Sequence, residues 1–266
     1  MPRWLPAAAL LGFAAVLLCL ERRAPLRPRV DPGPRRIARN LVVGAVTAAT
    51  VSALERPLTR HLTRSTERHG WGIVPMLRLP RWLAAAVTLI LLDYTLYLWH
   101  VLLHRASLLW RLHLAHHVDL DLDASTALRF HFLEFLASVP WRLAQIVVIG
   151  ATPRTLALWQ KLTAAEVIFH HSNVRLPPRV EHWLSRVVVT PGLHGVHHST
   201  VRAERDSNFS SGLTAWDFLH GTVRMDVPQE RITIGVPPFD EKRDVTLGKT
   251  LLAPFVSAAH QAAERS

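Results

Sequence analysis

The sequence predicts an all-α integral membrane protein with about four membrane-embedded helices and a cytoplasmic, histidine-rich helical cap. Apolar residues make up 49% of the 266 residues and charged residues only 19%, a balance typical of membrane proteins. The chain has 16 histidines, and several of them recur at the helical spacings i, i+3 and i+4. The net charge of +11 comes mainly from arginines that flank apolar runs, which favours lipid head groups over nucleic acid as partners.

Two apolar runs occupy the N-terminal part of the chain. Trp4–Leu20 is uncharged and has the minimum length for a membrane-spanning helix. A signal peptide or lipidation at Cys19 are the alternatives for this run. Ile37–Leu54 is a second short candidate span. Glu55–Arg81, which contains three prolines, is predicted to be a basic loop. The single cysteine excludes a disulfide framework and a cysteine-based metal site.

The strongest candidate span is Trp82–Leu103, which carries one charge, Asp93, near its middle. It ends among histidines, so the first histidine pair is predicted to lie at the membrane boundary. Phe132–Gly150 and Thr155–Phe169 are also apolar but contain charged residues. We expect them to form a helical hairpin that dips into or through the membrane and packs on protein. The polar remainder of the chain should form the water-facing cap.

Ten histidines fall into clusters that are suited to metal binding. They are His100, His104, His113, His116, His117, His131, His171, His194, His197 and His198. Imidazole is the commonest neutral metal ligand. Ten ligands are too many for one zinc site, whereas two metals with four or five nitrogens each fit the count. Imidazole suits Zn, Cu, Fe and Ni alike, so the ligands leave the metal open. The chain lacks Glu-x-x-His and HExxH, which argues against a soluble carboxylate di-iron protein and a zinc metalloprotease.

Three further polar residues are candidates to support the histidines. Metal-binding histidines usually donate their second ring N–H to a carboxylate, a carbonyl or water, which fixes the tautomer. Asp93 is one candidate acceptor, because an acid inside a membrane segment marks a functional site by default. Asn208 and Asp217 are the others.

The motifs occur in a fixed order along the chain. They stand as Asp93, Tyr97, His100 and His104-Arg105; Leu109-Trp110, His113 and His116-His117; Thr126, Arg129 and His131; Phe169, His171 and Asn173; Thr190-Pro191, His194 and His197-His198-Ser199; and Asn208, Trp216-Asp217 and Gly221-Thr222. In this order they closely resemble the membrane-bound fatty acid hydroxylase/sterol desaturase superfamily, over about Asp93 to Thr222. The chain departs from the superfamily pattern at Arg105, which follows the second histidine of the pair, at Val118 in place of serine, and at His220 in place of phenylalanine.

The resemblance implies a non-haem di-iron centre with the ten histidines as ligands. It implies O2 as co-substrate, and hydroxylation or desaturation of a sterol-like, fatty acyl or isoprenoid lipid. The two His-x-x-His-His triplets and the His100/His104 pair would then be catalytic. Zinc has no redox chemistry and does not suit this reaction. The chain has no haem-attachment motif, so electrons are expected from a separate ferredoxin or cytochrome-type donor. The alternatives are a di-zinc membrane hydrolase and a non-catalytic metal-binding membrane protein.

The predicted organisation of the chain follows from these assignments. Residues 1–81 hold N-terminal membrane helices and basic loops. Residues 82–225 form the hydroxylase-type catalytic domain, and residues 226–266 form a C-terminal cytoplasmic tail. The abundant alanine and arginine suggest a bacterial source. The predicted location is therefore the bacterial inner membrane, with the metal site facing the cytoplasm.

Overall fold

The computed structural model describes residues 5–237, 239 and 241–255, and within them the chain is built from helices and connecting loops. The helices are α1 (Leu5–Arg23), α2 (Pro34–Thr50), the π-helical turn η1 (Val51–Glu55), α3 (Arg56–His69), α4 (Ile73–Met76), α5 (Arg81–Arg105), α6 (Ser107–His117), η2 (Thr126–Leu128), α7 (Phe132–Ile149), α8 (Pro153–His171), α9 (Pro178–Leu184), α10 (Pro191–His197), α11 (Arg202–Arg205), α12 (Ala215–His220), η3 (Gln229–Arg231), α13 (Leu247–Leu252) and η4 (Ala253–Phe255). The predicted all-α class is confirmed.

Three helical stretches are long and apolar enough to cross a membrane, close to the predicted number of about four. They are Pro34–Met76, Arg81–Arg105 and Phe132–Ile149. The helix α5 covers the predicted span Trp82–Leu103, and α7 and α8 are the two consecutive helices predicted for the hairpin. They pack mainly on other helices rather than along each other, and insertion of α8 into a membrane stays a prediction. The turn between them begins at Gly150, whose positive φ of 85° favours glycine. The run Trp4–Leu20 becomes α1 from Leu5 onward, and its place in a membrane stays a prediction.

The loop predicted for Glu55–Arg81 is wrong over its first half, because Arg56–His69 is helical and continues α2 through η1. The prolines of this segment suggested a break in the helix. Pro57 instead lies in the first turn of α3, where a missing N–H is tolerated, just after a wider π turn. The threonine face of α3 is buried, and the Thr66 hydroxyl donates to the Ala151 carbonyl oxygen at 2.8 Å. Tertiary packing therefore stabilises a helix whose own composition is very polar.

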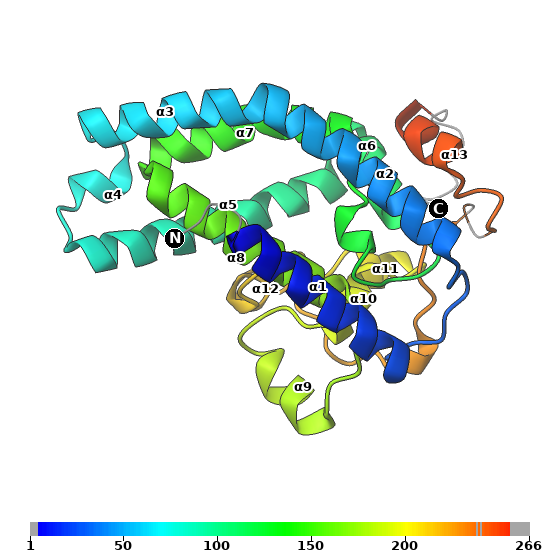
Figure 1. Ribbon diagram of the computed structural model, residues 1–266. Helices are drawn as coiled ribbons and strands as arrows, with labels where there is room; N and C mark the ends of the chain where they lie inside the picture. The colour runs from blue at the N-terminus through cyan, green and yellow to red at the C-terminus, as the bar shows by residue number, and fades with distance from the viewer. Residues whose placement is uncertain (1–4, 238, 240, 256–266) are drawn as a thin grey trace.

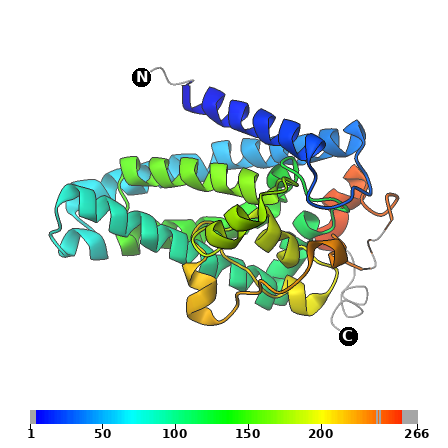
Figure 2. The same cartoon turned by 90° about the horizontal axis from the view of Figure 1, so that it is seen from below.

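The long helices α3, α5 and α7 lie side by side. Most of the short helices lie at the end of the bundle where α5 leads into α6, whereas α4 lies at the opposite end, between α3 and α5 (Figure 1). α3 runs along α7, and α5 packs on α6, α7 and α8. Leu92 of α5, Ile146 of α7 and Trp159 of α8 belong to one buried apolar cluster. α1 lies on the outside of this bundle against α8, as Figure 2 also shows. Large apolar side chains on the outer surface of α1, such as Leu11 and Val16, are exposed, as expected for contact with lipid.

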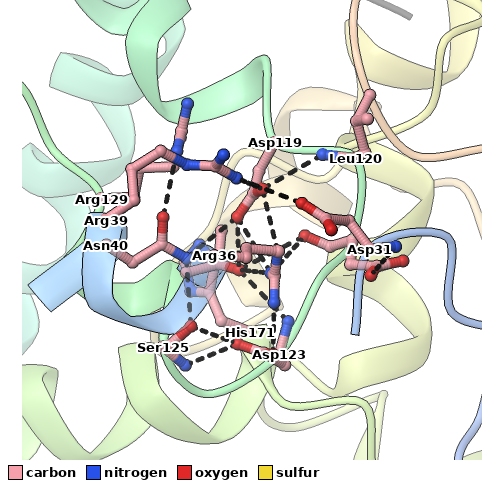
Figure 3. A network of polar contacts seen from close by, with 12 residues as sticks. Asp31, Arg36, Arg39, Asn40, Asp119, Leu120, Asp123, Ser125, Arg129 and His171 are labelled. Carbon is pink, nitrogen blue, oxygen red and sulfur yellow. Dashed lines mark hydrogen bonds and ion pairs between the residues drawn. The ribbon is translucent and has the colours of Figure 1, made fainter. Parts of the chain in front are cut away.

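A buried ionic network fixes α2 to the loop that follows α6 (Figure 3). The Arg36 guanidinium donates to both carboxylate oxygens of Asp119, at 3.0 and 2.9 Å, and it also forms an ion pair with Asp123. Both Arg36 and Asp119 are almost completely buried. Burial alone would raise the pKa of Asp119, but the guanidiniums of Arg36 and Arg129 hold it well below its usual range. Asp119 is two residues beyond His117, so this network sets the position of the histidine helix α6.

Arg129 extends the network to the other side of α6. Its Nε donates to the Ala115 carbonyl oxygen at 2.9 Å, Nη1 donates to the Asn40 side-chain oxygen at 3.0 Å, and Nη2 donates to the Thr250 hydroxyl at 2.7 Å. Burial lowers the pKa of Arg129 to about 10, so it stays charged at neutral pH. One arginine thereby connects α2, α6 and α13.

Replacing Asp119 by asparagine should destabilise the protein strongly. The change leaves the buried Arg36 and Arg129 without their shared counter-charge, and breaking a buried pair on one side typically costs about 3–5 kcal/mol. A large fall in the thermal unfolding midpoint of the detergent-solubilised protein would show this. The matched control is Asp226→Asn, because that side chain is 81% exposed. Equal midpoints for the two variants would contradict the role given to Asp119.

Candidate metal centre

Nine of the ten predicted histidines come together in two adjacent groups. The first group is His100, His104, His113, His117 and His197, and the second is His116, His171, His194 and His198. Within each group, one ligand nitrogen per residue lies within 4.8 Å of all the others. The groups touch, since the rings of His117 and His198 are 4.3 Å apart. The sequence predicted two sites with four or five nitrogens each, and this arrangement has that form.

Helix geometry explains how each group is assembled. On α5, His100 and His104 are one turn apart and share a face. On α6, the spacing sends His113 and His117 to the first group and His116 to the second. The second triplet is divided in the same way by α10 and its C-terminal end, so each triplet bridges the two groups.

Backbone carbonyl groups fix the orientation of four of the rings. His100 Nδ1 donates to the Phe209 carbonyl oxygen at 2.7 Å, and His197 Nδ1 donates to that of Ser207 at 2.8 Å. A ring nitrogen that donates to a carbonyl must carry the proton, and the neutral ring then has a lone pair on Nε2. His100 Nε2 and His197 Nε2 are buried and have no hydrogen-bond partner among the described residues. Their lone pairs are therefore free to bind a cation.

In the second group, the Nε2 atoms of neighbouring histidines approach one another closely. His116 Nδ1 and His171 Nδ1 face the carbonyl oxygens of Arg129 and Val167, at 3.3 and 2.7 Å. Their Nε2 atoms nevertheless lie 3.0 Å apart. His194 Nε2 lies 3.0 Å from His171 Nε2 and 3.1 Å from His198 Nε2.

His116 and His171 both keep their proton on Nδ1, so their facing Nε2 lone pairs repel unless a cation lies between them. Ligands 2.0–2.1 Å from a tetrahedral metal lie about 3.3–3.4 Å from one another. The observed separations are close to this, so the second group fits a metal ion. The first group fits one as well, on the basis of its unpartnered buried nitrogens.

Five of the histidines outside the membrane-spanning segments are held neutral. Burial lowers the pKa of His116, His117, His194, His197 and His198 well below the usual value of 6.5, and neighbouring imidazoles lower it further. A neutral imidazole is the form that binds a metal, so the site stays ready for a cation through the physiological pH range.

His131 is the one predicted ligand that lies apart from both groups. It is the N-cap of α7, where its Nδ1 accepts from the Leu133 backbone N–H at 3.2 Å. Its Nε2 faces the Leu251 carbonyl oxygen at 3.2 Å. Both nitrogens are thus used in local structure. The sequence could not distinguish this cap from a ligand, because both uses need a buried histidine beside the cluster.

The predicted supporting residues position neighbouring segments of the chain rather than the imidazole rings. Asp93 accepts from the Leu213 backbone N–H at 3.1 Å and from the Trp216 indole N–H at 2.7 Å, so it joins α5 to α12 and to the segment before it. Asp217 accepts from the backbone N–H groups of Phe209 and Ser210, both at 2.9 Å. It thereby positions the Phe209 carbonyl that orients His100.

Asn208 stabilises the same segment from its other side. Its φ of 50° lies in the left-handed region, which asparagine tolerates better than most residues. Its side chain donates to the Leu193 and Arg224 carbonyl oxygens and accepts from the Arg224 backbone N–H. Asn208 and Asp217 together hold the two carbonyl groups that fix His100 and His197.

Two side chains near the candidate metal sites were not assigned a role from the sequence. Glu134 is buried, and its Oε1 lies 3.1 Å from His113 Nδ1. The sequence feature that could have identified Glu134 is its position as an acid within an otherwise apolar helix. His170 is also buried, and its ring lies 4.0 Å from that of His194, outside both groups. The motif Phe169, His171 and Asn173 indicated His171 rather than His170 as the ligand, and the structure places only His171 in a histidine group.

A mainly apolar cavity of about 370 Å³ reaches both histidine groups from between α5, α7 and α8. Its wall includes Leu96, Leu103 and Phe135. At one end it is lined by histidines of both groups, namely His100, His113, His116, His171 and His194. An apolar molecule in this cavity would therefore lie directly beside the candidate metal sites.

Comparison with known proteins agrees with this architecture. The sequence profile of the family described as Fatty acid hydroxylase matches residues 85–222, just over half of the chain. The chain belongs to the fatty acid hydroxylase family, as the motif order predicted. No solved structure matches it significantly.

Curated relatives carry names of lipid-modifying enzymes. Ornithine lipid hydroxylase OlsE of Rhizobium tropici is 33% identical over 56% of this chain and 44% of its own length. Alkylglycerol monooxygenase of Homo sapiens is 25% identical over 72% of this chain and 42% of its own length. Cholesterol 25-hydroxylase of Mus musculus is 26% identical over 52% and 46%, respectively. The chain thus spans less than half the length of each of these relatives.

Metal content should separate the two groups. We expect two metal ions per wild-type chain after loading, and one in each of the double variants His104→Ala/His117→Ala and His194→Ala/His198→Ala, because each removes two ligands of one group. His131→Ala is the matched control and should keep both ions. Elemental analysis by mass spectrometry checks this. An unchanged metal content in both double variants would contradict the assignment.

The metal-free protein should lose stability in mild acid. The lowered pKa values of the folded state mean that these histidines take up protons more readily in the unfolded chain. Above the usual pKa of 6.5 both states are neutral, and the free energy of unfolding has its full value. As the pH falls from 6.5 towards the folded-state pKa, the free energy of unfolding decreases by up to about 1.4 kcal/mol per pH unit for each buried ring. Thermal unfolding between about pH 7.5 and about pH 5.5 measures this slope. The slope should survive replacement of the exposed His61, and a flat profile in the metal-free wild type would refute the explanation.

Proposed function

We propose that this protein is a membrane-bound, O2-dependent lipid hydroxylase with a non-haem di-iron centre held by the two histidine groups. The observation that carries the proposal is the apolar cavity that ends on histidines of both groups. The names of the family and of its relatives support the same chemistry. The proposed location is the bacterial inner membrane, and in the proposed orientation the histidines face the cytoplasm.

Oxidation of an unactivated C–H bond needs a redox-active metal, and two iron ions would supply this O2 chemistry when bound. Zinc would not, because it has no redox chemistry. In the balanced hydroxylation, one oxygen atom enters the C–H bond and the other leaves as water. Two electrons and two protons are consumed. The electrons require a separate reductant, for which we propose a ferredoxin or cytochrome-type protein.

The chain itself provides ligands, orientation and a dry environment. The carbonyl oxygens of Phe209 and Ser207 hold His100 and His197 in the tautomer that directs Nε2 into the first group. The histidines of the second group are at most 2% exposed. Exclusion of water protects reactive species from side reactions and strengthens electrostatic interactions at the metals.

The cavity would hold the lipid chain against this centre. Leu96, Leu103 and Phe135 provide apolar contact area. The carbon nearest His100 and His171 would be the one oxidised. The same geometry serves desaturation if two adjacent carbons lie there, and the product distinguishes the two outcomes.

Loading the purified protein anaerobically with Fe(II), and then adding a reductant and 18O2 in the presence of membrane lipids, tests this function. We expect a lipid product that carries one labelled oxygen atom, as detected by mass spectrometry. A product that lacks two hydrogen atoms and carries no label would instead indicate desaturation.

The zinc-loaded protein is the matched control and should be inactive. Ester hydrolysis by zinc-loaded, iron-free protein, with no oxidised product from the iron-loaded form, would refute the oxygenase and favour a di-zinc hydrolase. The variant His194→Ala/His198→Ala should also lose the oxidised product, because only one metal group would remain intact.

A further inference from the structure

The end of the cavity that lies away from the histidines is polar. There it is lined by Glu55 of η1, Arg142 of α7 and Gln160 of α8. α8 provides both ends, because His171 is eleven residues beyond Gln160. At a rise of about 1.5 Å per residue, the two ends are about 16 Å apart along this helix. A molecule that fills the cavity would therefore be apolar over most of its length and polar at one end.

Several buried polar atoms at this end have no hydrogen-bond partner among the described residues. They are Arg142 Nε, the Trp159 indole nitrogen and the Thr163 hydroxyl. Trp159 is 4% exposed. Arg142 Nε is 3.7 Å from Glu55 Oε1, which is too far for a hydrogen bond. Buried polar groups are nearly always hydrogen-bonded, so these atoms indicate a polar group that occupies this place.

A basic groove continues from the polar end of the cavity. It has a volume of about 540 Å³, lies between α3 and α8, and shares Glu55 and Gln160 with the cavity. Arg56, Arg60 and Arg64 line it. Their spacing of four residues puts all three on one face of α3.

This arginine row is not explained by the fold. Like charges one turn apart repel and weaken a helix. Arg60 and Arg64 form no ion pair with the part of the chain that the structure describes, and the one acid that lines the groove is Glu55. Arginine binds phosphate and carboxylate groups through two parallel hydrogen bonds, so the groove has the chemistry of an anion site.

We propose that the substrate is an amphiphile with an anionic head group, either a phosphate or a carboxylate. Its head binds in the groove at Arg60 and Arg64, and its apolar chain lies in the cavity with a carbon beside the histidines. This proposal rests on the proposed function, since it names the substrate class of the same site. The fixed distance between the groove and the histidines then selects the carbon that is oxidised.

Binding to the full-length protein in nanodiscs, without reductant, tests the head-group site independently of turnover. The probes are dodecyl phosphate, dodecanol and inorganic phosphate, and the signal is the fluorescence of tryptophans such as Trp99 and Trp159 in the cavity wall. We expect the alkyl phosphate to bind at least about tenfold more tightly than the alcohol, as expected for charge-assisted hydrogen bonds to arginine. Inorganic phosphate, which lacks the apolar chain, should bind more weakly than the alkyl phosphate.

The double variant Arg60→Gln/Arg64→Gln should lose this preference and bind the two chains equally. Arg68→Gln is the matched control, because Arg68 is on the same helix and does not line the groove. Arg60→Lys/Arg64→Lys should restore part of the preference, which shows that charge and not folding is responsible. Unchanged metal content and unfolding midpoint in the glutamine variant exclude a general loss of structure.

Three results would overturn the proposal: equal binding of phosphate and alcohol by the wild type, a preference that persists in the glutamine variant, or inorganic phosphate binding as tightly as dodecyl phosphate. The last would indicate a site for a free anion rather than for a lipid. Head-group-dependent binding without an oxidised product would refute the proposed function and leave this site standing. An oxidised product with no head-group preference in binding would support the proposed function and refute the head-group site.

Discussion

The convergence of imidazole lone pairs is the constraint on which the rest of the structure depends. Nine buried rings face one another in two groups, and in the second group their Nε2 atoms lie 3.0–3.1 Å apart. His116 and His171 both carry their proton on Nδ1, so their facing Nε2 lone pairs repel unless a cation lies between them. Burial lowers the pKa of His116 and His171, so these two rings do not relieve the repulsion by taking up protons. The fold therefore holds a geometry that gains its stability when metal is bound.

Much of the remaining structure keeps these rings in place. The Arg36–Asp119 network fixes the end of α6, and Arg129 connects the same helix to α2 and α13. Asp217 and Asn208 shape the segment whose carbonyl groups orient His100 and His197. These contacts join residues far apart in the sequence, so the centre is assembled only when the whole bundle has folded.

The cavity and the basic groove connect the histidine centre to the surface of the helix bundle. α8 passes from the groove to the histidines, so one rigid helix determines the distance between them. η1 and α3 form the remaining wall of the polar end of the cavity and of the groove. The π-helical turn at Val51–Glu55 allows the helix to continue past Pro57, and this continuation places the arginine row beside α8.

The sequence by itself determined the helical membrane class, the family and nine of the histidines that form the two groups. Their spacing on helices and the apolar runs are local properties, which a sequence pattern records directly. Only the tertiary structure decided which histidine belongs to which group, that His131 caps α7, and that Asp93 binds α5 to the segment before α12. It also decided that Arg56–His69 is helical, because burial of its threonine face outweighs the local proline and arginine signals. Such contacts depend on partners distant in the sequence, and so no local pattern could predict them.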